Sequence, residues 1–196
     1  MAVDYEQIRP SLRTGDIVLF SGRRLISRLI QIGTLSRWSH VGVVIRLPDN
    51  YNTVLLMEST TISRVRDYFT RRVIRGVSMV LLSDRVRTYK GRVAVRRLVN
   101  VDRDDEFEAA FARLRRQLHG RRYETSLMEL LRSAVDLPFW RNRRDLSSVF
   151  CSELVAEGYI RAGLLSGKMP PNEYTPDDFA HIRLKKGDLT GIEEIK

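Results

Sequence analysis

The only cysteine of the chain lies in the stretch Val149-Phe150-Cys151-Ser152-Glu153-Leu154-Val155-Ala156-Glu157-Gly158-Tyr159. Apolar residues follow this cysteine by three, four and eight positions, which is the spacing of one helical face. We predict a helix that begins near Ser147 or Ser148 and ends at Gly163, with Cys151 in its first turn. Free N–H groups and the helix dipole favour a nucleophilic thiolate there. Considered alone, a buried cysteine that serves as a small apolar side chain is the simpler interpretation, so the rest of the chain must supply a base.

Short apolar runs that favour β-structure precede this helix and predict the strands of a sheet. The predicted strands cover residues 17–20, 38–46, 53–59, 77–82 and 92–98. Further helices are predicted over residues 25–32, from an N-cap at Asp102 to residue 118, and over 127–135. The tail, 169–179, is rich in turn residues and has one short helical turn. Because strands and helices do not alternate regularly, we predict an α+β fold with a mostly antiparallel sheet packed against helices.

The composition is typical of a globular protein, with 43% hydrophobic residues in 196. We expect residues 1–196 to form a single domain. No segment approaches the apolar length of a transmembrane helix, and the first residues lack the pattern of a secretion signal. The expected location is therefore the cytoplasm, and a lone cysteine excludes an internal disulfide.

The chain is strongly basic, with a formal net charge of +10, and 29 of its 34 basic residues are arginine. This charge indicates an acidic partner, such as an anionic lipid or a cell-wall polyanion. The arginines are spread along the whole chain, and no nucleic-acid-binding module accompanies them. Composition therefore argues against a nucleic-acid function.

His40 is the histidine best placed to act as a base. It begins the apolar run 41–45, which predicts a central strand, where an imidazole is neither a good core filler nor a good surface residue. A turn at Pro48-Asp49-Asn50 predicts a hairpin that brings Glu58 close to His40, at the end away from the turn. Glu58 would orient the imidazole, with Ser59 or Thr60 as alternatives for that role. Considered singly, a structural hydrogen bond is the favoured interpretation of His40, and for Glu58 pairing with an arginine is at least as good an interpretation.

The order of these residues along the chain carries further information. In a papain-type hydrolase the cysteine helix comes before the sheet that bears the histidine. Here only 45 residues (196 − 151) follow Cys151, and they are too rich in turns to build that sheet. A cysteine–histidine enzyme on this chain would therefore be a circularly permuted papain-like protein, with its nucleophile helix C-terminal to the sheet.

Four blocks in order support this arrangement. They are Gly15-Asp16-Ile17-Val18-Leu19-Phe20, Ser39-His40-Val41-Gly42-Val43-Val44, Met57-Glu58-Ser59 and Phe150-Cys151-Ser152-Glu153-Leu154-Val155. Together they resemble the successive blocks of the circularly permuted NlpC-type papain-like cysteine hydrolases, in the YiiX-like branch, which is related to lecithin:retinol acyltransferase. The resemblance runs from about Arg13 to Phe179, nearly the whole chain.

The resemblance implies that Cys151 is the nucleophile, His40 the base and Glu58 the polar third residue, with no cofactor and no metal. It also places Tyr123 at the wall of the site, and we expect Trp38 and Trp140 to bind substrate. The implied activity is that of a thiol hydrolase or acyltransferase. Such an enzyme acts on an amide, ester or thioester through an acyl-enzyme, with the cysteine N–H helping to hold the oxyanion.

Two other functions stay open. The same fold could act as a cysteine endopeptidase or amidase on peptide-like links of the cell-wall type. A catalytically inactive relative would instead be a binding module that docks on anionic lipid or nucleic acid through its basic surface. In the thiol hydrolase or acyltransferase, the apolar segment 127–140 would accept an acyl chain. With any of the three functions, it could instead complete the core.

Overall fold

The computed structural model describes residues 2–23, 36–60, 63–121 and 146–196. Its centre is a six-stranded sheet in the order β4-β3-β2-β1-β5-β8, in which every neighbouring pair is antiparallel. The strands are β1 Ile17–Gly22, β2 His40–Leu47, β3 Asn50–Thr60, β4 Gly76–Leu81, β5 Gly91–Arg96 and β8 Glu193–Glu194. A small second sheet pairs β6 Leu98–Val99 with β7 Asp188–Leu189.

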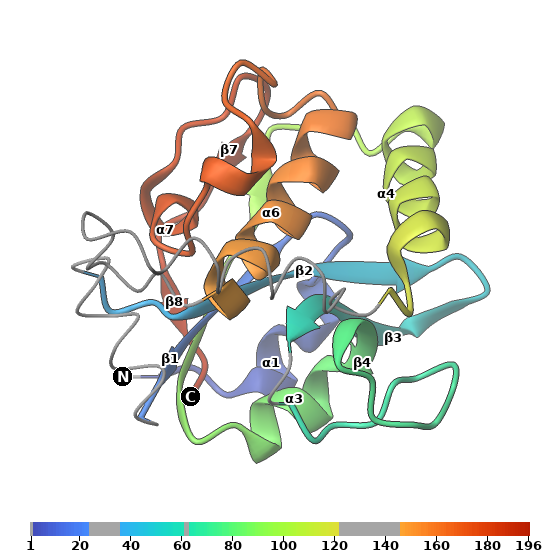
Figure 1. Cartoon of the computed structure of the whole chain (residues 1–196), viewed down its shortest axis with the longest axis vertical. Coiled ribbons are helices and arrows are strands. Elements are labelled where there is room, and N and C mark those ends of the chain that lie inside the picture. Colours follow the sequence, from blue (N-terminus) through green and yellow to red (C-terminus); the bar gives the residue numbers. More distant parts are fainter. Residues whose placement is uncertain (1, 24–35, 61–62, 122–145) are drawn as a thin grey trace, which may run out of the picture.

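Helices cover both faces of the large sheet (Figure 1). The helices on one face are α4 Asp105–Leu118, α6 Leu146–Arg161 and α7 Asp178–His181; those on the other are α1 Tyr5–Ile8 and α3 Leu82–Thr88. The short 3-10 helices Arg9–Ser11 and Pro171–Glu173 complete the described elements. The predicted α+β class with a mostly antiparallel sheet is confirmed.

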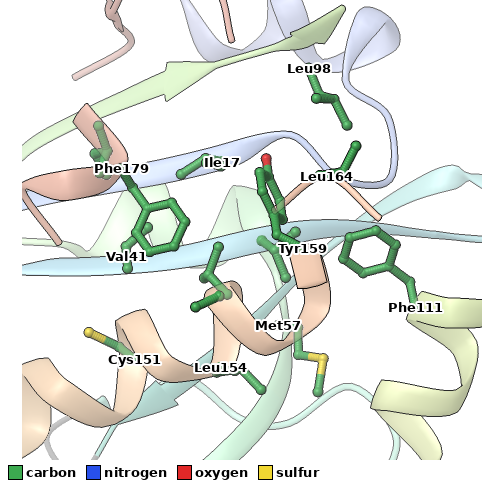
Figure 2. Close-up of a cluster of buried hydrophobic side chains, with 14 of the residues drawn as sticks. Ile17, Val41, Met57, Leu98, Phe111, Cys151, Leu154, Tyr159, Leu164 and Phe179 are labelled. Atoms are coloured by element: carbon green, nitrogen blue, oxygen red, sulfur yellow. The ribbon is translucent and has the colours of Figure 1, made fainter. Parts of the chain in front are cut away.

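The core consists of two apolar clusters, because successive strand residues point to opposite faces. In β1, Ile17 and Leu19 face α6, while Val18 and Phe20 face α3. Figure 2 shows the α6-side cluster around Tyr159, which is fully buried. The Tyr159 hydroxyl donates a hydrogen bond to the Gly15 carbonyl at 2.6 Å, and this bond ties the middle of α6 to the turn before β1.

The predicted hairpin is confirmed. β2 and β3 pair in the register Val43↔Met57 to Arg46↔Val54, with an irregularity next to the turn. β3 is longer than the predicted 53–59, because backbone pairing continues into polar residues at both ends, whereas β2 begins at His40 rather than at residue 38 and ends one residue later than predicted.

Three other expectations need correction. The segment 82–88 was assigned to the end of one strand and a connection, but it forms α3, whose apolar residues Leu82 and Val86 are one helical turn apart. The N-cap of α4 is Asp104, whose Oδ1 accepts the Phe107 N–H at 2.8 Å, and not Asp102. No strand is predicted after residue 179, but β8 adds a sixth strand at the sheet edge. The predicted helices over 25–32 and 127–135 lie outside the described residues.

The helix that carries Cys151 ends as predicted and begins earlier. Gly163 has a φ of +70°, and the N–H groups of Leu164 and Gly163 bond the carbonyls of Tyr159 (2.8 Å) and Ile160 (3.0 Å). This is a Schellman cap, which uses the freedom of glycine at positive φ. At the other end α6 begins at Leu146, so Cys151 lies in its second turn rather than its first. None of the helices in the described parts of the chain is long and apolar enough to cross a membrane.

Asp16 organises the backbone in front of β1. Its side chain is 1% exposed and accepts the Arg13 N–H at 2.8 Å and the Leu98 N–H at 2.9 Å, and Arg103 Nη2 lies 3.2 Å from it. Burial raises the pKa of this carboxyl to about 6, against the opposing effect of these hydrogen bonds and of Arg103. Asp16 therefore has a structural role at the junction of both sheets.

Asp16→Ala should lower the free energy of unfolding by about 2–3 kcal/mol, because the change leaves buried N–H donors without an acceptor. Urea unfolding followed by circular dichroism measures the loss. The control is Asp188→Ala, which removes an exposed hydrogen bond to Asn100 and should cost less than about 1 kcal/mol. Equal losses in the two variants would contradict the role assigned to Asp16.

Candidate active site

The structure brings His40 and Glu58 into direct contact. His40 is the first residue of β2 and Glu58 lies near the end of β3, so both occupy the end of the hairpin away from its turn. His40 Nε2 lies 2.6 Å from Glu58 Oε2. The Glu58 side chain is fully buried, and that of His40 is 12% exposed. The contact predicted from the hairpin is confirmed, and it is Glu58 that bonds the imidazole.

Cys151 meets the same imidazole from α6. Its side chain makes a hydrogen bond with that of His40 and is fully buried. Because Nε2 is engaged by Glu58, the nitrogen available to the thiol is Nδ1. Cys151, His40 and Glu58 therefore form a chain of contacts in that order, with the imidazole in the middle.

Cys151 and His40 approach each other from different layers of the molecule. His40 is opposite Phe20 in the β1–β2 register, and their ring centroids are 5.3 Å apart on the α3 side of the sheet. Cys151 belongs to the cluster on the α6 side, close to Val41 (Figure 2). They meet because His40 begins its strand, so its ring is at the sheet margin that the N-terminal part of α6 reaches.

Arg85 completes the network from α3. Its Nε lies 2.9 Å from Glu58 Oε1 and donates a hydrogen bond to Oε2 at 3.0 Å. The guanidinium carbon lies over the rings of Phe20 and Tyr89, 5.0 and 5.1 Å from their centroids, and the two rings also contact each other edge to face. Sequence reasoning missed this residue, because α3 was not predicted and one arginine among 29 has no distinguishing pattern.

These contacts decide the charge states. Burial by itself would lower the pKa of His40, but the negative charge and hydrogen bond of Cys151, with those of Glu58, outweigh it and raise the pKa to about 9. Burial likewise opposes ionisation of Glu58, yet the positive charge of Arg85 and the contact with His40 hold the pKa of this carboxyl below its usual value. The arrangement favours the imidazolium form of His40 beside the ionised carboxylate of Glu58.

Comparison with known proteins supports the fold. No protein-family model and no curated protein matches the sequence. Among solved structures, the chain is similar to the metalloprotein YiiX from Escherichia coli O157:H7, with 19% sequence identity and a TM-score of 0.50. The match covers 92% of this chain and 88% of that chain. This chain has a YiiX-like fold.

Within this YiiX-like fold, Tyr89 and Ser39 hold the start of β2. The Tyr89 side chain hydrogen-bonds that of Ser39, and burial is the main cause of its raised pKa. Ser39 Oγ also accepts the Gly22 N–H at 3.2 Å, which joins the ends of β1 and β2. These residues keep the His40 backbone in place at the sheet margin.

Of the predicted substrate-binding residues, only Trp38 lies within the described part of the chain. Trp38 is 1% exposed and belongs to the α6-side core, so its position favours packing over contact with substrate. Tyr123 and Trp140 lie outside the described residues, as does the apolar segment 127–140.

Proposed function

We propose that the chain is a thiol hydrolase or acyltransferase with a circularly permuted papain-like active site. The observation that carries this proposal is the continuous contact chain Cys151–His40–Glu58, which joins a thiol, a base and an orienting carboxylate. A cysteine that only filled the core would need no imidazole at its sulfur and no ionised carboxylate behind it. The order of the elements supports it as well, because β1 to β5 come before the cysteine helix α6.

In the proposed reaction, His40 holds the proton of the thiol and leaves Cys151 as thiolate. The sulfur attacks the carbonyl carbon of an amide, ester or thioester, and a carbon–sulfur bond forms. As the bond to the leaving group breaks, the imidazolium returns its proton to that group. A water molecule or another acceptor then gives a proton to His40 and takes the acyl group from the sulfur. Glu58 stays ionised throughout and stabilises the imidazolium.

One element of the sequence-based mechanism is withdrawn. The Cys151 N–H was expected to hold the oxyanion from the helix start. Because α6 begins at Leu146, this N–H lies beyond the first four of the helix, where N–H groups bond carbonyls of the preceding turn. The oxyanion would need another donor.

The site geometry does not fit a metal centre, although YiiX is a metalloprotein. The thiol and Glu58 engage different nitrogens of the His40 ring, so their donor atoms do not converge on one point. Glu58 is also engaged in an ion pair with the Arg85 guanidinium, which competes with any metal ion for its oxygens. In the described residues, no group of three or more histidine, cysteine or acidic side chains is arranged to hold a metal ion.

Incubation with p-nitrophenyl acetate, an activated ester, tests the proposal. The protein should gain one acetyl group on Cys151, detected by intact mass spectrometry and peptide mapping, because the thiolate attacks the ester carbon. Neutral hydroxylamine should remove the group, since thioesters are labile to this reagent and lysine amides are not. Cys151→Ser should form no hydroxylamine-sensitive adduct of this kind. Acetylation of lysines alone in the wild-type protein would rule the proposal out.

A further inference from the structure

A basic cavity of about 450 Å³ lies on the α3 side of the sheet, next to the candidate active site. Among the described residues, the cations that line it are Arg64, Arg66, Arg85, Arg87 and Lys90, and the acidic residue is Asp84. Asp84 is paired with Arg87 at 2.7 Å. The cavity therefore presents an excess of positive charge and lies within the size range of small-molecule sites.

The innermost of these cations is Arg85. It is 7% exposed, and both of its contacts with Glu58 use Nε. Its two Nη nitrogens make no hydrogen bond with any of the described residues. Arg85 lines the cavity, so an anionic ligand there can accept hydrogen bonds from these two nitrogens.

At the rim, Arg64 and Arg66 are exposed and have no ion pair within the described parts of the chain. They lie in the segment that follows β3, on the same cavity as α3. Arginine is well suited to phosphate, because its planar donor fork binds two oxygens at once. A cavity with three such forks, one of them buried, is suited to a group with several negatively charged oxygens.

We propose that this cavity binds a phosphate group, held by Arg85 from within and by Arg64 and Arg66 at the rim. The phosphate belongs either to a soluble phosphate ester or to a lipid headgroup. The bound group would be two contacts from the imidazole, because Arg85 bonds Glu58 and Glu58 bonds His40. Binding uses no thiol chemistry, so it does not depend on the proposed function.

Isothermal titration with inorganic pyrophosphate, at physiological salt, tests the site on the 196-residue chain with the Cys151→Ser substitution. Binding should be saturable, and Arg64→Ser/Arg66→Ser should weaken it about thirtyfold, because charge-assisted hydrogen bonds to arginine are lost. The matched control is Arg113→Ser/Arg116→Ser, which removes two exposed charges from α4 and should leave the affinity within about twofold. Arg85→Lys, which keeps the charge but not the fork, should also weaken binding.

A second arm measures sedimentation with phosphatidylglycerol vesicles. The site is assigned to a lipid headgroup if pyrophosphate displaces the protein from the vesicles and if Arg64→Ser/Arg66→Ser loses vesicle binding while the control double variant keeps it. Pyrophosphate binding without vesicle binding assigns it to a soluble phosphate ester. Equal loss in both double variants, or no binding in either arm, would overturn the proposal, whatever the outcome of acetylation at Cys151.

Discussion

His40→Ala should slow the alkylation of Cys151 by iodoacetamide about a hundredfold at pH 6. A factor of about a hundred is the lower end of the rate loss expected when an acid–base partner is removed. The reason is the contact of the imidazole with the thiol, which stabilises the thiolate. The raised pKa of His40, about 9, keeps the imidazolium present across neutral pH. The wild-type rate should therefore be nearly constant from pH 6 to 8. In the variant, thiolate must form without the imidazolium, so the rate should rise steeply with pH.

The measurement is loss of free thiol over time at each pH, and the single cysteine makes the signal unambiguous. The control is His181→Ala, which removes an imidazole that is 74% exposed and should leave both rate and pH profile unchanged. Circular dichroism verifies that both variants are folded. The same steep pH profile in wild type and His40→Ala would contradict a thiolate–imidazolium pair.

Glu58→Gln should lower the free energy of unfolding by about 3–5 kcal/mol at pH 7, because it leaves the buried Arg85 charge without its counter-ion. The glutamine keeps the size of the side chain, so the loss reports the charge rather than a cavity. In the wild type, the lowered pKa of Glu58 adds stability that is present above the ordinary glutamate pKa and is lost as pH falls through the folded value. The difference between wild type and variant should shrink in acid.

Urea unfolding at pH 7 and at lower pH measures this loss, with Glu157→Gln as the matched control. Glu157 lies 2.6 Å from Arg161 one turn away on α6, and both side chains are 30% exposed. An exposed pair of this kind contributes less than about 1 kcal/mol. In the double variant Glu58→Gln/Arg85→Met the buried charge is gone as well, so most of the loss should be recovered. Similar losses at Glu58 and Glu157, or no recovery, would show that the buried pair is not the cause.

The alkylation and unfolding experiments separate two properties of the Cys151–His40–Glu58–Arg85 network, which are the reactivity of the thiol and the stability of the fold. Glu58→Gln should also reduce thiol reactivity, since the glutamine cannot stabilise the imidazolium as a carboxylate does. His40→Ala should reduce reactivity while it leaves the Glu58–Arg85 pair in place. If Glu58→Gln is less stable than the wild type but its Cys151 is alkylated at the normal rate, Glu58 stabilises the fold and does not activate the thiol.

Local patterns in the sequence determined much of this protein. Apolar spacing after Cys151 and a glycine at position 163 predict α6 and its Schellman cap, because both depend on residues within one helix. The hairpin turn at 48–50 fixes which strands are neighbours, and this is enough to place Glu58 beside His40. Apolar runs therefore predicted the strands, helical spacing predicted α6, and the turn predicted the central contact of the site.

Only the tertiary structure decided what lies around that contact. Arg85 acquires its role from being buried against Glu58 of β3, Phe20 of β1 and Tyr89 at the end of its own helix. Nothing in its local sequence separates it from the other arginines. Likewise, α6 begins before the turn that its capping residues predicted, which moves Cys151 into the second turn. The sequence determined which residues could react. The packing of distant elements determined the charge each of them carries, because burial and ion pairing depend on neighbours that local pattern does not specify.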